Sequence, residues 1–112
     1  MVALKEMMPI DPAERDFVEA TLRRHPSVSR FANRLQQHVQ DHFQQPVINL
    51  DALAHDEWDP PLAIEVTADI PEDEYVSRLH ELRRWAHLDP DYDPALMQII
   101  LLRRPVAGIG KR

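Results

Sequence analysis

The chain has 112 residues, of which 44% are hydrophobic and 29% are charged, and its formal net charge is −6. These values are typical of one folded globular domain and argue against intrinsic disorder. The absence of cysteine excludes disulfides, cysteine-containing zinc sites, iron–sulfur clusters and a thiol nucleophile. The only glycines are Gly108 and Gly110, so the glycine-rich phosphate loops and the nucleophile elbow of serine hydrolases are also excluded.

No apolar run approaches the roughly 20 residues that a membrane-spanning helix needs, and no run is longer than that at 99–102. Lys5 and Glu6 fall where a signal peptide requires its apolar region. We therefore expect a soluble, cytoplasmic protein that does not insert into a membrane. We also expect a single domain over the whole chain, with flexible ends at 1–9 and 105–112.

Two helices are predicted in the first part of the chain. The first begins at Asp11, which can cap it, with Pro12 at the first helical position and Glu14 at the third. It should end near Arg24, because a proline follows two residues later. The second helix, 27–43, is predicted from apolar residues at helical spacing. These residues are Val28, Phe31, Ala32, Leu35, Val39 and Phe43.

The rest of the chain predicts two strands, a helix and a final strand. Residues 47–53 form a weak strand pattern, whereas 62–68 alternate between apolar and polar as a half-buried strand does. The third helix is predicted over 71–87, with acidic residues at its positive end. The last strand, 96–102, is apolar on nearly both faces, and such a strand is usually covered on both sides.

The order of elements, ααββαβ, predicts an α+β fold in which two N-terminal helices precede a ββαβ unit with a three-stranded mixed sheet. The strand–helix–strand unit from 62 to 103 should form a right-handed crossover with parallel strands. Its helix should cover one face of the sheet, and the N-terminal helices the other face or an end of it. Because the loop at 54–61 is long for a hairpin, we expect the last strand to lie between the first two.

Three aspartates at alternate positions, Asp89, Asp91 and Asp93, could begin a calcium-binding loop of the EF-hand type. That loop requires glycine at its sixth position and glutamate at its twelfth, where this chain has Pro94 and Ile100. Asp89 and Asp93 also precede prolines, a pattern that favours turns. The sequence therefore predicts a turn here and not a calcium site.

His38, Asp41 and His42 form a second candidate metal site. Residues three and four apart are neighbours on a helix, and two imidazoles with one carboxylate are known metal ligands. The same geometry opposes the site, because His42 falls within the apolar face, His38 at its border and Asp41 toward solvent. A metal-dependent enzyme or metal-binding protein that uses these residues is thus kept only as an alternative hypothesis. The sequence identifies no cofactor and no catalytic residue.

The distribution of charge is the main functional indication. No lysine or arginine occurs within 35–77, a stretch that holds ten acidic residues and thus a formal charge of −10. Such a stretch should present a negative surface that attracts basic partners and disfavours nucleic acids. The alternative is that the arginine pairs at 23–24, 83–84 and 103–104 neutralise these acids within the fold.

We therefore predict a non-enzymatic interaction protein of the inhibitor, antitoxin, immunity-protein or adaptor type, whose acidic face binds another protein with a basic surface. The expected contact residues are Asp56, Glu57, Trp58, Asp59, Glu72, Asp73 and Glu74. Trp58 would serve as the aromatic anchor. Pairing of sheet edges in a homodimer is a further expectation. A nucleic-acid-binding module using the arginine pairs is the third hypothesis, although the chain lacks interleaved aromatic residues and a basic net charge.

Overall fold

The computed structural model describes residues 4–52 and 60–105. In chain order, the helices and strands are α1 (Pro12–Arg24), α2 (Pro26–His42), β1 (Gln44–Ala52), β2 (Leu62–Asp69), α3 (Tyr75–His87) and β3 (Met97–Arg104). Two short 3-10 helices, η1 (Leu4–Met7) and η2 (Glu72–Glu74), precede α1 and α3. The predicted order ααββαβ and the α+β class are confirmed. Among the described helices, none is long and apolar enough to cross a membrane.

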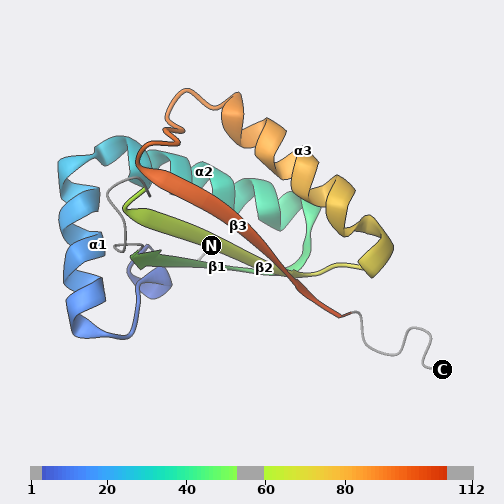
Figure 1. Cartoon of the computed structure of the whole chain (residues 1–112), viewed down its shortest axis with the longest axis horizontal. Coiled ribbons are helices and arrows are strands. Elements are labelled where there is room, and N and C mark those ends of the chain that lie inside the picture. The colour runs from blue at the N-terminus through green and yellow to red at the C-terminus, as the bar shows by residue number, and fades with distance from the viewer. Residues whose placement is uncertain (1–3, 53–59, 106–112) are drawn as a thin grey trace.

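The strands form one mixed sheet in the order β1-β2-β3 (Figure 1). β1 pairs antiparallel with β2, and β2 pairs parallel with β3, so that Ile64 lies opposite both Leu50 and Ile99. As predicted, α3 connects the two parallel strands. The expectation that the last strand lies between the first two was wrong, because β2 is the central strand. A long connection between adjacent antiparallel strands adds little loop-closure entropy, so loop length was a poor guide to strand order.

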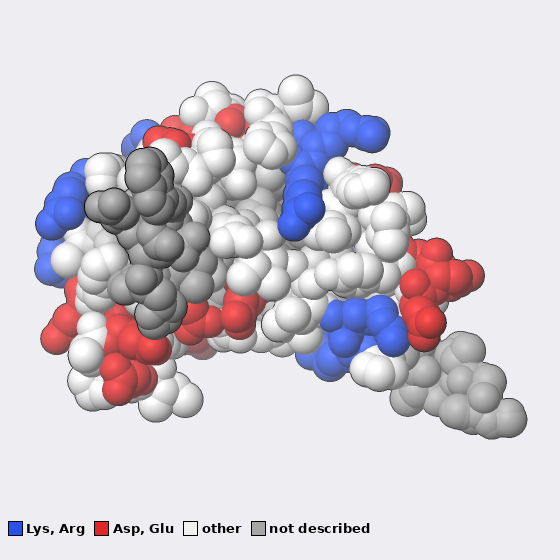
Figure 2. Space-filling model, viewed as in Figure 1, with Lys and Arg blue, Asp and Glu red and all other residues white. Residues whose placement is uncertain are grey.

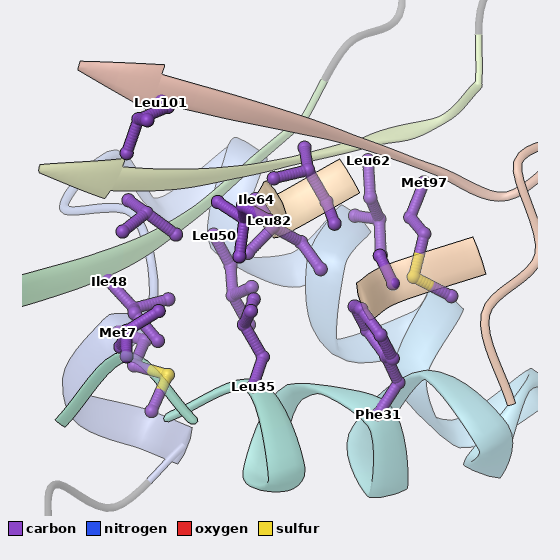
Figure 3. Close-up of a cluster of buried hydrophobic side chains, with 14 of the residues drawn as sticks. Met7, Phe31, Leu35, Ile48, Leu50, Leu62, Ile64, Leu82, Met97 and Leu101 are labelled. Atoms are coloured by element: carbon purple, nitrogen blue, oxygen red, sulfur yellow. The ribbon is translucent and has the colours of Figure 1, made fainter. Parts of the chain in front are cut away.

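α2 and α3 pack on the same face of the sheet (Figures 1 and 3). The ring of Phe31 in α2 lies 5.7 Å, centroid to centroid, from that of Trp85 in α3, and side chains from all three strands point toward this helix layer. The expectation that the N-terminal helices cover the opposite face was therefore wrong for α2. α1 instead packs beside β1 and against α2, which agrees with the alternative that it covers an end of the sheet.

The core lies between the helix layer and one face of the sheet (Figure 3). In β3 the buried residues are Met97, Ile99 and Leu101, which alternate with exposed or half-buried ones. The expectation that this strand is covered on both sides was wrong, since Leu102 is 43% exposed. Ile100 and Leu102 made the strand look apolar all round, yet they face away from the helices.

The residues before α1 also contribute to the core. Within the range 1–9, which we expected to be a flexible end, Met7 is buried in the main hydrophobic cluster. α1 begins as predicted, because the N–H of Glu14 donates a hydrogen bond of 3.0 Å to Oδ2 of Asp11. Packing of the segment before α1 against β1 brings Asp11 and Glu14 close to the sheet.

Candidate functional site

Arginines of α2 hold two of the aspartates in the turn before β3. Arg34 donates to Asp89 from Nε at 2.8 Å and from Nη2 at 2.7 Å, and it also pairs with Asp91. Arg30 donates two hydrogen bonds of 3.2 Å to Asp91. Hydrogen bonds from Arg34 lower the pKa of Asp89, and those from Arg30 and then Arg34 lower the pKa of Asp91.

The same turn is also stabilised by its own backbone. The N–H of Asp91 donates to Oδ1 of Asp89, and the N–H of Ala95 donates to Oδ1 of Asp93, both at 2.9 Å. Side-chain-to-backbone bonds of this type define Asx turns. The predicted turn is confirmed, and arginines and backbone amides occupy the carboxylate oxygens that a calcium ion would need.

The three candidate metal ligands on α2 do not point toward one position. The imidazole of His38 is stacked between the ring of Trp85, at a centroid distance of 4.2 Å, and that of His42, at 4.3 Å. Nδ1 of His42 lies 2.9 Å from the carbonyl oxygen of His38, and Asp41 accepts a hydrogen bond of 3.1 Å from Gln37. Over residues 4–52 and 60–105, no group of three or more histidine and acidic side chains has an arrangement that could hold a metal ion.

The expected contact residues at the start of α3 have basic neighbours within the chain. Glu74 lies 3.7 Å from Arg78, and Glu72 lies 3.7 Å from Arg103. Asp73 is exposed and takes part in none of the ion pairs found among the described residues. Two of these three contact residues are thus partly neutralised within the fold.

The neighbouring end of β3 repeats this pattern. Nε of Arg104 donates to Oδ1 of Asp69 at 2.8 Å. Figure 2 shows basic and acidic atoms side by side at the end of the molecule that carries the start of α3 and the end of β3. The neutralisation alternative therefore holds for the arginine pair at 103–104, whereas the pairs at 23–24 and 83–84 take part in none of the ion pairs found among the described residues. The other expected contact residues, Asp56, Glu57, Trp58 and Asp59, lie outside the described residues.

A second group of acids lines a hollow near the other end of the sheet. The hollow has a volume of about 380 Å³ and lies between the segment that leads into α1, the first turn of α1, β1 and β2. Figure 2 shows acidic atoms gathered where Figure 1 places the start of α1. The acidic residues of this hollow, which we call the acidic hollow, are Asp11, Glu14, Asp51 and Glu65.

The acidic hollow is electrostatically crowded. Asn49 lies opposite Glu65 in the β1–β2 pair, which places Asp51 one diagonal step from Glu65 on the same side of the sheet. Burial raises the pKa of Glu65, and the charge of Asp51 and a hydrogen bond with it raise that pKa further. No lysine or arginine is among the described residues that line the hollow. Arg15 lies beside the hollow, where its Nε donates a hydrogen bond of 3.1 Å to the carbonyl oxygen of the lining residue Pro9. Asp51 and Glu65 thus repel one another, and neither takes part in the ion pairs found among the described residues.

The sequence pattern does not indicate this hollow. It predicts a helix cap at Asp11 and Glu14, and it places Asp51 and Glu65 only within the acidic stretch. The alternation in 62–68 does indicate that Glu65 faces away from the core. Its position next to Asp51 depends on the register between two strands, which the sequence does not specify.

No protein-family model matches this chain, and no curated protein or solved structure matches it either. The geometry and charge of the acidic hollow therefore carry the functional inference.

Proposed function

We propose that this chain is a non-enzymatic interaction protein, of the inhibitor, antitoxin, immunity-protein or adaptor type, which binds a basic surface of another protein through the acidic hollow. The supporting observation is the gathering of four carboxylates in one hollow that no described lysine or arginine lines. An arginine or lysine of a partner would relieve the repulsion between Asp51 and Glu65 and form charge-assisted hydrogen bonds. The hollow thus offers a basic side chain a site that is already negative.

Two groups of acids within the stretch 35–77 have different roles in this proposal. At the start of α3, arginines of the same chain pair with Glu72, Glu74 and Asp69. In the acidic hollow, Asp51 and Glu65 have no such partner among the residues that the structure describes. Long-range attraction of a basic partner is therefore directed toward the hollow.

The loop residues expected as contacts stay part of this proposal on the grounds of sequence. The segment 53–59 follows Ala52, which ends β1 one residue after Asp51. In sequence, it adds three acids and one tryptophan directly after β1. Tryptophan is enriched among residues that dominate interfaces. The added residues are Asp56, Glu57, Trp58 and Asp59.

An affinity pull-down from the host's lysate tests the proposal. The bait would be the wild type or the variant Asp51→Asn/Glu65→Gln, at about 50 mM and about 500 mM salt, because salt screens charge–charge contacts. We expect a stoichiometric basic partner that the wild type captures at low salt and that the variant captures at least about tenfold less.

A matched control separates the hollow from net charge. Asp16→Asn/Glu19→Gln makes the same change in charge on α1, at positions that do not line the hollow. It should capture as much partner as the wild type. Absence of a basic partner at low salt, or equal losses for the two variants, would contradict the proposed function.

A further inference from the structure

A groove runs between α2 and α3, at a distance from the acidic hollow. The two helices lie side by side and antiparallel in this region (Figure 1). Two contacts in opposite chain order establish that arrangement: Arg78 Nη1 donates to the carbonyl oxygen of His42 at 2.9 Å, and Nε of Arg34 donates to Asp89 at 2.8 Å. No residue that lines the groove also lines the hollow.

Two adjoining hollows, of about 300 Å³ and about 440 Å³, make up this α2–α3 groove. Trp85 and Leu88 line both of them, and Phe43 and Leu82 also line the smaller one. Leu88 is 80% exposed although it is a large apolar residue, and exposed apolar surface of this kind marks interaction sites. The same surface thus carries an apolar hollow and, on its rim, a protruding leucine.

The charged groups that line the groove nearly cancel. Arg34 pairs with two aspartates of the turn before β3, and Arg78 lies 3.7 Å from Glu74. The two histidines of the groove count as neutral at pH 7. Two exposed charged side chains are left, Glu81 and Arg84, which take part in none of the ion pairs formed between described residues. The groove therefore offers an occupant one acid and one base beside an apolar floor.

The acid, the base and the protruding leucine share one side of α3. Glu81, Arg84 and Leu88 follow one another at spacings of three and four residues, and Leu88 directly follows the last residue of α3. In an antiparallel helix pair, the second helix presents the same residues in reverse order. A second copy of α3 whose contact is centred near Arg83 therefore brings Glu81 of each copy next to Arg84 of the other. It also brings Leu88 of each copy to the end of the other groove that Arg78 lines.

This arrangement distinguishes a second copy from other occupants. A helix of uniform charge, acidic or basic, would place a like charge next to Glu81 or Arg84. A flat aromatic ligand would meet a Trp85 ring that already stacks on His38 at a centroid distance of 4.2 Å. A second copy complements both charges, and its Leu88 supplies an aliphatic group that fits the apolar hollow.

We propose that two copies of this chain associate through the α2–α3 groove as a two-fold symmetric homodimer. Leu88 of each copy packs into the hollow of the other, against Phe43 and Leu82, and Glu81 of each copy pairs with Arg84 of the other. Such an interface uses the same patch on both subunits, as two-fold dimers do. It is distinct from the pairing of sheet edges expected from the sequence, and it involves no residue that lines the acidic hollow.

Sedimentation-velocity ultracentrifugation of the full chain over a concentration series tests the proposal. We expect the wild type to shift from monomer to dimer as its concentration rises to about 1 mM, a range that covers weak specific complexes. Leu88→Ser should raise the dissociation constant of the dimer at least about tenfold, as for a residue at the centre of an interface. The control Val76→Ser, which is 61% exposed on α3 outside the groove, should dimerise as the wild type does. A wild type that stays monomeric throughout, or equal weakening by the two variants, would overturn the proposal.

Charge reversal tests the two reciprocal pairs. Glu81→Arg and Arg84→Glu should each weaken the dimer at least about tenfold, because each variant places like charges together at both pairs. The double variant Glu81→Arg/Arg84→Glu restores opposite charges and should dimerise within about threefold of the wild type. For the same reason, an equimolar mixture of the two single variants should form a heterodimer. A double variant that dimerises no better than the single ones would overturn the proposed contact.

Two controls separate the contact from net charge and from the proposed function. Arg83→Glu makes the same change in charge as Arg84→Glu at an exposed residue that does not line the groove, and it should leave the dimer intact. Asp51→Asn/Glu65→Gln changes the acidic hollow alone and should also dimerise as the wild type does. Loss of the dimer in either control would overturn the groove as the interface. Failure to find a basic partner in a lysate, by contrast, has no bearing on this result.

Discussion

Glu65 connects the fold to the proposed function at the scale of a single residue. It lies on β2, on the side of the sheet away from the helices, where Asp51 on the neighbouring strand has the same charge. Burial and this neighbour disfavour the ionised form and raise its pKa. Residues that bind partners are often kept at some cost in stability. We interpret the pair of Asp51 and Glu65 as such a case.

Replacing Glu65 by glutamine should stabilise the folded protein at neutral pH, by at most about 1 kcal/mol because the side chain is partly solvated. The folded-state pKa of Glu65 lies above its unfolded value, so this carboxyl lowers wild-type stability as pH rises through that interval. Below the interval it is protonated in both states, and the advantage of Glu65→Gln should vanish. Urea denaturation of both proteins at several pH values measures this difference. A variant that is less stable than the wild type at neutral pH would contradict the interpretation.

Asp89 should behave in the opposite way. Its side chain is only 7% exposed, and hydrogen bonds from Arg34 hold its pKa below the ordinary value. The Asp89 carboxylate therefore contributes its full stabilisation of the folded protein at pH values above the ordinary carboxyl pKa. This contribution is lost as pH falls through the lowered pKa of the folded state. Asp89→Ala should reduce the free energy of unfolding by about 1 kcal/mol at neutral pH.

Asp93→Ala is the matched control for that experiment. Asp89 and Asp93 each accept one hydrogen bond from a backbone N–H two residues later, whereas only Asp89 is bound by Arg34. Urea denaturation of the two variants should show the larger and more pH-dependent loss for Asp89→Ala. Equal losses would mean that the arginine contact does not stabilise the turn.

At the scale of elements, the helix layer depends on the apolar face of α2. Phe31 is fully buried there, and its ring lies 5.7 Å from that of Trp85 and 5.2 Å from that of Tyr92. Phe31→Ala should lower the free energy of unfolding by about 3–5 kcal/mol, a large part of the total for a small domain. Phe17→Ala on α1, where the side chain is 38% exposed, is the control and should cost about 1 kcal/mol or less. Thermal and urea unfolding measure the loss of stability in each variant. Similar losses for Phe31→Ala and Phe17→Ala would contradict this prediction.

Elements with local signals were predictable from the sequence, and those with non-local determinants were not. Asp11 and Pro12 defined the start of α1 correctly because capping involves only adjacent residues. The helix predicted from residue 71 begins instead at Tyr75, because η2 precedes it as a separate 3-10 turn. Strand order and the choice of covered face depend on packing between distant segments, and both were predicted incorrectly.

The candidate sites illustrate the same limit. Arg34 and Asp89 lie 55 residues apart in sequence, so nothing in the aspartate pattern indicated an arginine partner. The sequence did identify the acidic stretch in which Asp51 and Glu65 occur. It could not separate these residues from Glu72 and the other acids that arginines neutralise, because that distinction depends on which groups meet in space.

At the scale of the whole molecule, arginines neutralise the acidic residues at one end of the sheet. Toward the other end, negative charge stays concentrated in the acidic hollow. Arginines pair with acids around the start of α3, whereas the acidic hollow has no described basic lining residue. A basic partner approaching a chain with a net charge of −6 would be drawn toward the hollow by this asymmetry. Its approach should be faster at low salt, because screening shortens the range of the attraction.

An NMR titration of the isotope-labelled full chain with a short arginine-rich peptide at low salt examines this binding residue by residue. We expect chemical-shift changes concentrated at Asp51, Glu65 and the segment 9–14, and we expect Asp51→Asn/Glu65→Gln to abolish them. Changes concentrated at η2, or spread evenly over all acidic residues, would contradict the acidic hollow as the site that binds basic partners.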